Sequence, residues 1–204
     1  SPPNDVCADD GVTLLTYSAT GTCAPVGSDE TACTYAPVAT ACSDDGLACS
    51  DATCQGAIPY PENHGDVVLS EFLVHSNLAG DLGEWFEYMN QTDKPLNLKG
   101  CWLSDNSGEG HAIEANLVIL PGKAIVIGRS YDLAVNGGVV VDYSVGDTFT
   151  LDVEGDAINL SCAGIAIDAV NTKTVGGTMP PGVALSLSPF SVDAEANDLA
   201  VAWC

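Results

Sequence analysis

The fold is decided by residues 83–90 (GEWFEYMN) and residues 96–105 (LNLKGCWLSD). In the first run, Phe86 and Tyr88 alternate with Trp85, Glu87 and Met89. Because successive side chains of a strand point to opposite faces, this alternation predicts a half-buried strand. The polar residues 91–95 (QTDKP) are typical of a hairpin loop, and the second run resumes the apolar pattern. The two runs therefore predict two strands joined by a tight turn.

Further short apolar runs recur at regular spacing after residue 66, with Gly and Pro between them. We expect strands at residues 67–74, 112–120, 123–128, 139–143, 149–153, 157–162, 165–170 and 183–187. Residues 123–128 are expected to pair with residues 112–120. Residues 149–153 are expected to form a hairpin with residues 157–162. Residues 193–202 fit a loop or a turn of helix. No convincing amphipathic helix interrupts the pattern, which is typical of an all-β sandwich or barrel.

Residues 1–57 have a different composition, because large apolar residues are scarce and most of the cysteines lie there. The segment CADDG at 7–11 returns as CSDDG at 42–46, which indicates a degenerate internal repeat. Such a segment cannot fold by burial alone, so we expect disulfide bonds to hold it. Its six cysteines are Cys7, Cys23, Cys33, Cys42, Cys49 and Cys54. Their spacing leaves the pairing open.

The predicted organisation is a disulfide-stapled module at residues 1–57, a linker at 58–65 with two prolines, and a β-sandwich at 66–204.

The cysteines also indicate the compartment. The chain has nine of them, and no C-x-x-C motif of the kind that binds zinc. Disulfide bonds in an extracellular protein are the expected use. We expect Cys162 to pair with Cys204, because a terminal residue frays unless it is held. Cys101 is then the odd cysteine, either a buried thiol or a bond to another chain.

Charge excludes several classes of partner. The chain has 28 Asp and Glu residues against five Lys and Arg, and its formal net charge is −23. Such a surface repels phosphate backbones and anionic membranes, so nucleic acid is not an expected partner. No apolar run approaches the roughly 20 residues of a membrane helix, so membrane insertion is not expected.

Calcium is the ligand that the acidic turns suggest, because Ca²⁺ takes six to eight oxygen ligands from flexible loops. The predicted ligands are Asp9, Asp10, Asp44, Asp45, Asp51, Asp105, Asp152 and Asp156. None of these clusters has EF-hand spacing. The simpler alternative for each cluster is a solvated turn, which Asp favours for its local hydrogen bonds.

No catalytic residues are predicted. Glu84 and Glu87 are three residues apart, a separation that puts their side chains on opposite faces of a strand. The histidines His64, His75 and His111 are scattered over expected loops, and neither G-x-S-x-G nor H-E-x-x-H occurs. The sequence therefore favours a protein that is not an enzyme.

From residue 66 onward the chain resembles the lamin tail domain. The resemblance lies in VVLSEFLV at 67–74, in GEWFEYMN and LNLKGCWLSD, and in ILPGKAIVIG at 119–128. It implies an immunoglobulin-like β-sandwich, of the type found in secreted bacterial proteins, that mediates protein contacts. The cysteine-rich front is similar to disulfide-stapled repeats of bacterial surface proteins. The coiled-coil rod of nuclear lamins has no counterpart here.

Together these features favour a non-enzymatic extracellular protein, a subunit of a cell-surface filament, sheath or similar assembly. Its expected partners are other copies of itself or other surface proteins. The alternatives are an adhesion or glycan-binding module, calcium-assisted or not, and an accessory domain of a secreted hydrolase.

Overall fold

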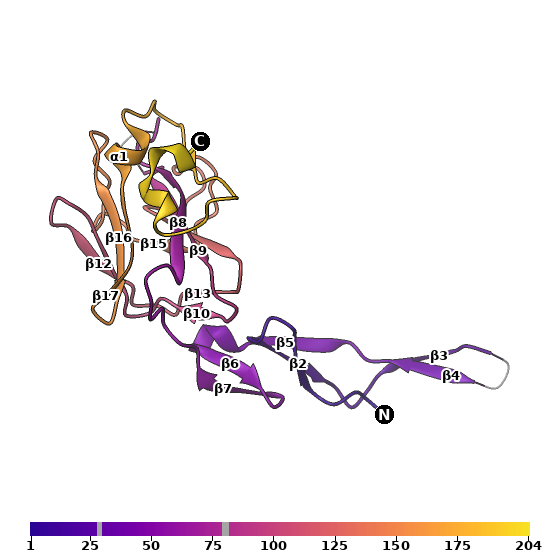
Figure 1. The fold of residues 1–204 in the computed structure, drawn as a ribbon. Helices are drawn as coiled ribbons and strands as arrows, with labels where there is room; N and C mark the ends of the chain where they lie inside the picture. Colours follow the sequence, from indigo (N-terminus) through magenta and orange to yellow (C-terminus); the bar gives the residue numbers. More distant parts are fainter. Residues whose placement is uncertain (28–29, 79–81) are drawn as a thin grey trace. The chain divides into compact units, whose positions relative to one another are not determined.

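The computed structural model describes residues 1–27, 30–78 and 82–204, and these residues form two compact units. The first unit is Ser1–Ile58 and the second is Pro59–Cys204. Both are built from strands (Figure 1). The predicted fold class, an all-β immunoglobulin-like sandwich with a small disulfide-rich N-terminal module, is confirmed.

The first unit contains three separate small sheets. The antiparallel order β1-β2-β5 makes the largest sheet, and β3 pairs with β4 and β6 with β7. Their bounds are Val6–Cys7 for β1, Thr13–Tyr17 for β2, Thr22–Pro25 for β3, Thr31–Thr34 for β4, Pro37–Ala41 for β5, Leu47–Ser50 for β6 and Thr53–Ala57 for β7. A 3₁₀ turn, η1 (Cys42–Asp45), precedes β6.

The repeated Asp-Asp-Gly segments are turns that end in a left-handed glycine. Gly11 and Gly46 both have a φ of 71°, a conformation that residues with a Cβ rarely adopt. In the first copy, the Asp10 carboxylate accepts hydrogen bonds from the backbone N–H groups of Val12 (3.0 Å) and Thr13 (2.9 Å). These bonds hold the pKa of Asp10 below its usual value, although partial burial acts in the opposite direction.

The second unit contains a five-stranded sheet of order β15-β14-β9-β8-β18. Its strands are β8 (Val67–Leu73), β9 (Trp85–Asn90), β14 (Ala124–Gly128), β15 (Tyr143–Ser144) and β18 (Leu185–Ser186). A four-stranded sheet of order β12-β11-β16-β17 forms the other layer. Its strands are β11 (Trp102–Ser104), β12 (Gly110–Ala112), β16 (Ala157–Cys162) and β17 (Ile165–Asn171), and a further pair joins β10 (Leu96–Asn97) to β13 (Val118–Ile119).

Short helical turns complete the second unit. They are α1 (Thr172–Gly176), η3 (Ala196–Asp198) and η4 (Ala200–Ala202). No helix in the described part of the chain combines the length and the apolar character that crossing a membrane requires.

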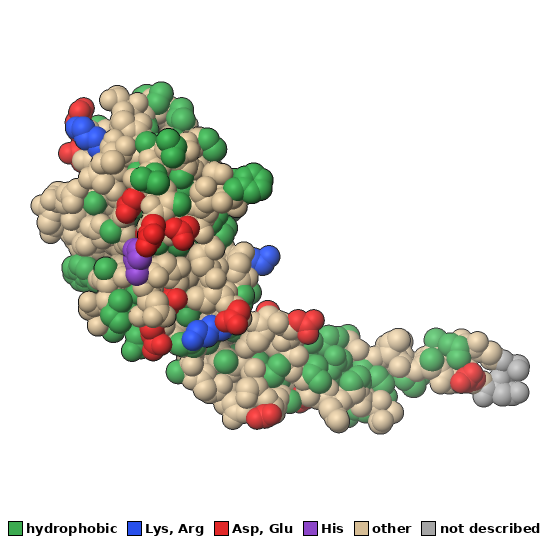
Figure 2. All heavy atoms as spheres, viewed as in Figure 1, with side chains coloured by type: hydrophobic (Ala, Val, Ile, Leu, Met, Phe, Trp, Pro, Cys, Tyr) green, Lys and Arg blue, Asp and Glu red, His purple; other side chains and the backbone are tan. Residues whose placement is uncertain are grey.

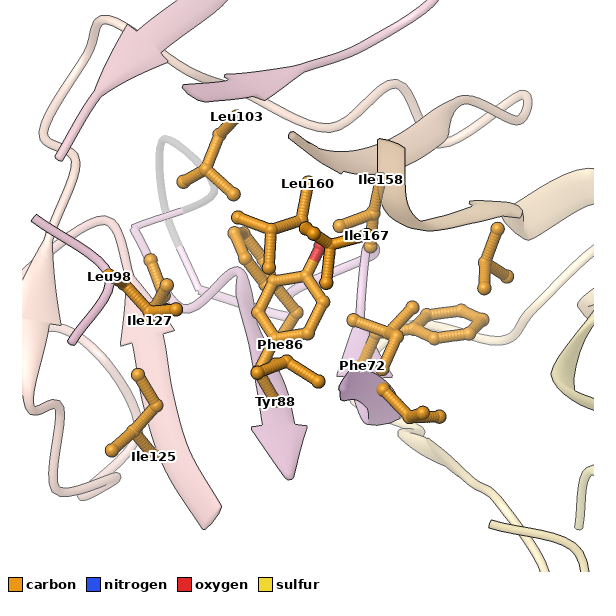
Figure 3. Close-up of a cluster of buried hydrophobic side chains, with 14 of the residues drawn as sticks. Phe72, Phe86, Tyr88, Leu98, Leu103, Ile125, Ile127, Ile158, Leu160 and Ile167 are labelled. Carbon is orange, nitrogen blue, oxygen red and sulfur yellow. The ribbon is translucent and has the colours of Figure 1, made fainter. Parts of the chain in front are cut away.

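The core of the second unit lies between its two sheets. Phe72, Phe86 and Tyr88 project from one sheet toward Leu160 and Ile167 of the other, and all five are buried (Figure 3). Along β9 every second residue is buried, which confirms the predicted alternation. Because these side chains interlock across the layers, the apolar pattern of the sequence is sufficient to explain this sandwich.

The predicted turn between residues 83–90 and 96–105 does not make a hairpin. Strand β9 pairs with β8 and β14, whereas β10 pairs with β13 and β11 pairs with β12 and β16. The buried Asn90 side chain donates to the carbonyls of Lys94 (2.9 Å) and Ile119 (2.8 Å). The turn after β9 is therefore held against β13, which contains Ile119. Gly100, with a φ of 84°, then splits the second run into two short strands. The chain therefore crosses from one sheet to the other.

Two other predicted pairings are also wrong. Strand β14 pairs with β9 and β15 instead of with the preceding run. Residues 149–153 are not a strand, and β16 forms its hairpin with β17 around Ala163 and Gly164, both at positive φ.

Residues 59–65, expected as a linker, are hydrogen-bonded to the second unit. The Pro59 carbonyl accepts from Asn97 N–H at 2.8 Å, and Gly65 N–H donates to Ile167 at 2.9 Å. The Asp66 carboxylate accepts from the backbone of Glu62 and Asn63, each at 2.9 Å. This segment thus begins the second unit, and its prolines do not leave it loose.

Candidate functional site

The β3–β4 hairpin is a strongly exposed part of the first unit. All eight residues of its two strands are exposed, and Figure 1 shows the hairpin running out from β2 and β5. Ala24 pairs with Ala32 on one face, and Cys23 pairs with Cys33 on the other. A two-stranded hairpin is marginally stable by itself in water, so the Cys23–Cys33 disulfide is its main constraint. We call this hairpin the arm.

The two strands of the arm are uncharged in an otherwise acidic chain, although the sequence between them includes Asp29 and Glu30. Residues 11–28 and 31–43 contain no Asp, Glu, Lys or Arg, although the whole chain carries −23. Two acidic molecules repel each other least where their surfaces are neutral. The strands of the arm are therefore a part of the chain where such repulsion is weak.

An exposed apolar surface lies at the end of the second unit. Phe190 is 96% exposed and Val201 is 92% exposed, and Leu199 is exposed as well. Backbone bonds between Ser186 and Cys204 (3.0 and 2.9 Å), and from Ser188 N–H to the Ala202 carbonyl (2.7 Å), bring the two segments together.

Figure 2 shows hydrophobic side chains on the face of the second unit over which the C-terminal segment runs in Figure 1. We call Phe190, Leu199 and Val201 the C-terminal apolar patch. Residues 174–192, which include Phe190, carry no charged side chain, whereas the exposed Asp198 directly precedes Leu199.

A buried carboxyl group anchors the segment that carries this patch. Asp168 on β17 is 1% exposed, and its Oδ2 accepts from Leu69 N–H (2.6 Å) and from Asn197 Nδ2 (2.8 Å). The Asn197 carbonyl in turn accepts from Trp203 Nε1 at 2.7 Å. Burial raises the pKa of Asp168 from 3.8 to about 6, against the lowering effect of its hydrogen bonds. Asp168 therefore links β8, β17 and the C-terminal segment.

The disulfide pairing corrects the sequence-based prediction. In the first unit, Cys7 bonds Cys49, Cys23 bonds Cys33 and Cys42 bonds Cys54.

In the second unit Cys101 bonds Cys162, and Cys204 is a free, exposed thiol. The predicted pair of Cys162 with Cys204 and the predicted free Cys101 are therefore wrong. Trp102 lies opposite Ser161 in the register of β11 and β16, which places the cysteines that flank them side by side. Cys204 needs no disulfide to hold it, because its backbone is bonded to Ser186.

The carboxylates of the first predicted strand do not form a catalytic pair. Glu84 is buried, accepts from Leu151 N–H at 3.1 Å, and lies 3.8 Å from Arg129 Nη1. Glu87 instead accepts from Ser70 Oγ on β8. Each carboxylate therefore has a structural contact of its own.

His111 closes the sandwich between the edges of its two sheets. Its Nδ1 lies 2.7 Å from Thr148 Oγ1 and its Nε2 lies 2.8 Å from the Tyr143 hydroxyl. Thr148 Oγ1 already donates to the Val145 carbonyl, so Nδ1 carries the proton and Tyr143 donates to Nε2. Burial lowers the pKa of His111, with Glu114 acting in the opposite direction. The neutral ring thus ties β12 to β15.

The predicted calcium ligands are not gathered into a site. Within the described ranges, no three His, Cys, Asp or Glu side chains are grouped so as to hold a metal ion. Several of the carboxylates accept hydrogen bonds from backbone N–H groups of their own turns. Asp105 accepts from Gly108 and Glu109, and Asp152 accepts from Glu154, as Asp10 does from Val12 and Thr13. Asp156 is buried and accepts from Asn106, Asp152 and Ala157. Asp9, Asp44, Asp45 and Asp51 lie exposed in turns of the first unit.

A comparison with protein families matches residues 61–174 to the lamin tail domain, which is more than half of the chain. The chain belongs to the lamin tail domain family. This family is immunoglobulin-like and non-catalytic, in agreement with the two-layered second unit. No curated protein and no solved structure matches the chain. Its four disulfides indicate an oxidising, extracellular environment for this lamin tail domain protein.

Proposed function

We propose that this protein is a non-enzymatic structural component of an extracellular assembly, in which copies of the chain contact one another. The observation that carries the proposal is the arm, with eight exposed strand residues held by a disulfide and no charged residue in either strand. An exposed β-hairpin with nothing packed on its faces is an element that gains stability when a partner covers it.

The surface proposed to receive the arm is the C-terminal apolar patch of a second copy. Exposed apolar side chains such as Phe190 and Val201 gain free energy when a contact removes them from water. The arm and the patch are different surfaces, so the contact is heterologous. Repetition of such a contact makes a ring where the rotation closes and an open filament where it does not.

Charge makes the proposal specific. Each copy carries −23, so association must overcome a long-range repulsion. Salt screens this repulsion but leaves a neutral contact unchanged, since the Debye length falls from about 30 Å at 0.01 M to about 8 Å at 0.15 M. We therefore expect association to strengthen as the salt concentration rises, whereas an interface held by salt bridges would weaken.

Support for the extracellular location comes from the disulfides, and the secreted bacterial origin rests on the sequence resemblance alone. The family supports a role in protein contacts without defining the assembly. A filament, a sheath or a smaller ring would each satisfy the proposed contact.

Sedimentation velocity of the whole chain, at rising concentration and at two salt concentrations, tests the proposal. Ala24→Glu on the arm and Phe190→Glu on the patch should each weaken association about tenfold or more, because each buries a charge in a neutral contact. Ala115→Glu adds the same charge at an exposed site outside both surfaces and serves as the control. A chain that stays monomeric at every salt concentration, or one equally weakened by all three substitutions, would contradict the proposal.

A further inference from the structure

A cleft of about 250 Å³ opens beside Trp85 in the second unit. Its described lining comes from four segments of the chain: residues 73–78, Gly83 with Trp85, residues 136–139 and Gly182. Among described residues, this lining brings together a half-buried tryptophan, a serine and two asparagines. Trp85 lies on the outward face of β9, so its ring is not part of the core.

One wall of the cleft is rigid. Asn136 is buried, and its Nδ2 donates to the carbonyls of Ser130 and Val139, each at 2.8 Å. Its Oδ1 accepts from the N–H groups of Gly138 and Val139. Because these bonds occupy the whole amide, Asn136 shapes the loop and is not available to a ligand.

The opposite wall offers a polar group that is available. Asn77 is exposed, and its side chain makes no hydrogen bond to another residue that the structure describes. The backbone beside it is fixed, since Gly182 N–H donates to the His75 carbonyl at 2.7 Å. A Cβ on Gly182 would lie 2.8 Å from Asn77 Nδ2, so glycine is what allows the amide to approach this closely. Asn77 thus presents a donor and an acceptor at the cleft beside the Trp85 ring.

The cleft carries no charged side chain among its described lining residues, in a chain with 33 charged residues, 28 acidic and five basic. A charged ligand would find no counterion among these described residues, and a purely apolar ligand would leave the Asn77 amide unpaired. An aromatic ring beside a free amide suits a neutral ring that has one apolar face and several hydroxyl groups.

We propose that this cleft binds a neutral sugar residue of a glycan, with the ring of Trp85 against the apolar face of the sugar and the Asn77 amide hydrogen-bonded to its hydroxyl groups. Trp85 and Asn77 are the residues that determine binding, and the glycines around them keep the cleft open. Trp85 and Asn77 belong to neither the arm nor the C-terminal apolar patch, and sugar binding does not require self-association.

The test uses the ¹⁵N-labelled whole chain, at a concentration where sedimentation shows monomers, titrated separately with cello-, malto-, xylo-, manno- and chito-oligosaccharides. At least one series should shift the Asn77 side-chain signal and the amides of Gly83, Gly137 and Gly182 in a saturable way. Trp85→Ala should weaken that binding about tenfold or more, because it removes the contact surface for the sugar ring. Asn77→Ala, an exposed change that leaves the fold intact, should weaken it several-fold.

Trp102→Ala is the matched control, because Trp102 is 47% exposed on the other sheet and is the competing aromatic platform. It should leave the binding unchanged. The proposal is overturned if none of the five series gives saturable shifts, if Asn77→Ala binds as the unmodified chain does, or if Trp102→Ala abolishes binding. Loss of binding in Trp85→Ala counts in its favour only where the spectrum of that variant remains folded.

Discussion

The two units of this chain are stabilised in different ways. The second unit buries a continuous cluster that runs from Val67 to Trp203 and contains one disulfide. In the described part of the first unit the buried apolar residues are Val12, Cys42, Cys49 and Ile58, two of them already in disulfides. The comparison shows that one chain can combine a unit that folds by burial with a unit that folds by cross-linking.

This difference has a consequence for function. A unit without a core can leave its strands exposed on both faces, as the arm does, because burial is not what maintains it. A unit with a core exposes only some of its large apolar side chains to solvent, such as those of the C-terminal apolar patch. The proposed contact between copies thus joins the arm, which is not stabilised by burial within its own unit, to a surface that the sandwich holds in place.

The largest expected effect is in the core of the second unit. Phe86 is 2% exposed and packs edge-on against Tyr88 and Phe149, with ring centroids 5.7 and 5.9 Å apart. Phe86→Ala should lower the free energy of unfolding by about 3–5 kcal/mol, through lost burial and the cavity that remains. Val38→Ala, at a residue 62% exposed in the first unit, should change it by less than about 0.5 kcal/mol. Chemical denaturation followed by far-ultraviolet circular dichroism, which reports the strands of both units, measures both effects; equal effects would remove the contrast between the units.

The single disulfide of the second unit should be nearly as important. It closes a loop of 61 residues, so C101A/C162A should cost about 2–5 kcal/mol. C204S is the control and should be neutral within about 0.5 kcal/mol, because Cys204 is exposed and unbonded. It should also remove the one thiol that reacts with a thiol reagent in the unreduced protein. If C204S destabilised the protein as much as the double variant does, the result would instead favour a bond between Cys162 and Cys204.

The buried Asp168 predicts a dependence on pH. Its folded pKa of about 6 lies above the unfolded value of 3.8, so the folded state keeps the proton longer than the unfolded state does. The associated stability is fully present below about pH 4, falls as the pH rises toward 6, and is constant above that; the loss is about 3 kcal/mol. Asp168→Asn should flatten this part of the stability curve, while Asp132→Asn, at an exposed site, should not. If the stability of Asp168→Asn depended on pH just as that of the unmodified chain does, burial would not be raising the pKa of Asp168.

The smallest predicted effect has the opposite sign. The Tyr88 hydroxyl is buried, and it has no hydrogen-bond partner among the described residues. Tyr88→Phe keeps the ring and removes the uncompensated hydroxyl, so it should raise the free energy of unfolding by about 1 kcal/mol. Thermal unfolding followed by calorimetry measures the gain. A lower melting temperature would mean that the Tyr88 hydroxyl makes a hydrogen bond in solution.

The sequence was sufficient for the elements that depend on local pattern. The alternation along β9 predicted which of its side chains enter the core, and the composition of residues 1–57 predicted a unit that needs cross-links. Both follow from local chemistry, namely the two-residue period of a strand and the scarcity of large apolar residues.

Strand partners and the cysteine pairing depend on distant residues, and here the sequence-based predictions were wrong. Nothing within residues 91–95 reveals that Asn90 is bonded to Ile119 and so sends the chain to the other sheet. Likewise Cys101 meets Cys162 because β11 and β16 are neighbours, which local spacing does not encode. The arm had a signal that went unused, the absence of charge from residues 11–28 and 31–43. The cleft beside Trp85 had none, since four separate segments build it.

The most direct test of the contrast between the units is hydrogen exchange measured by mass spectrometry before and after complete reduction. We predict that, after reduction, peptides from residues 1–58 lose their protection, because this unit has little else to hold it. Peptides from the strands of residues 67–171 should keep most of their protection, because their core remains in place. Protection that survives reduction in residues 1–58, or that disappears equally in both units, would contradict the account.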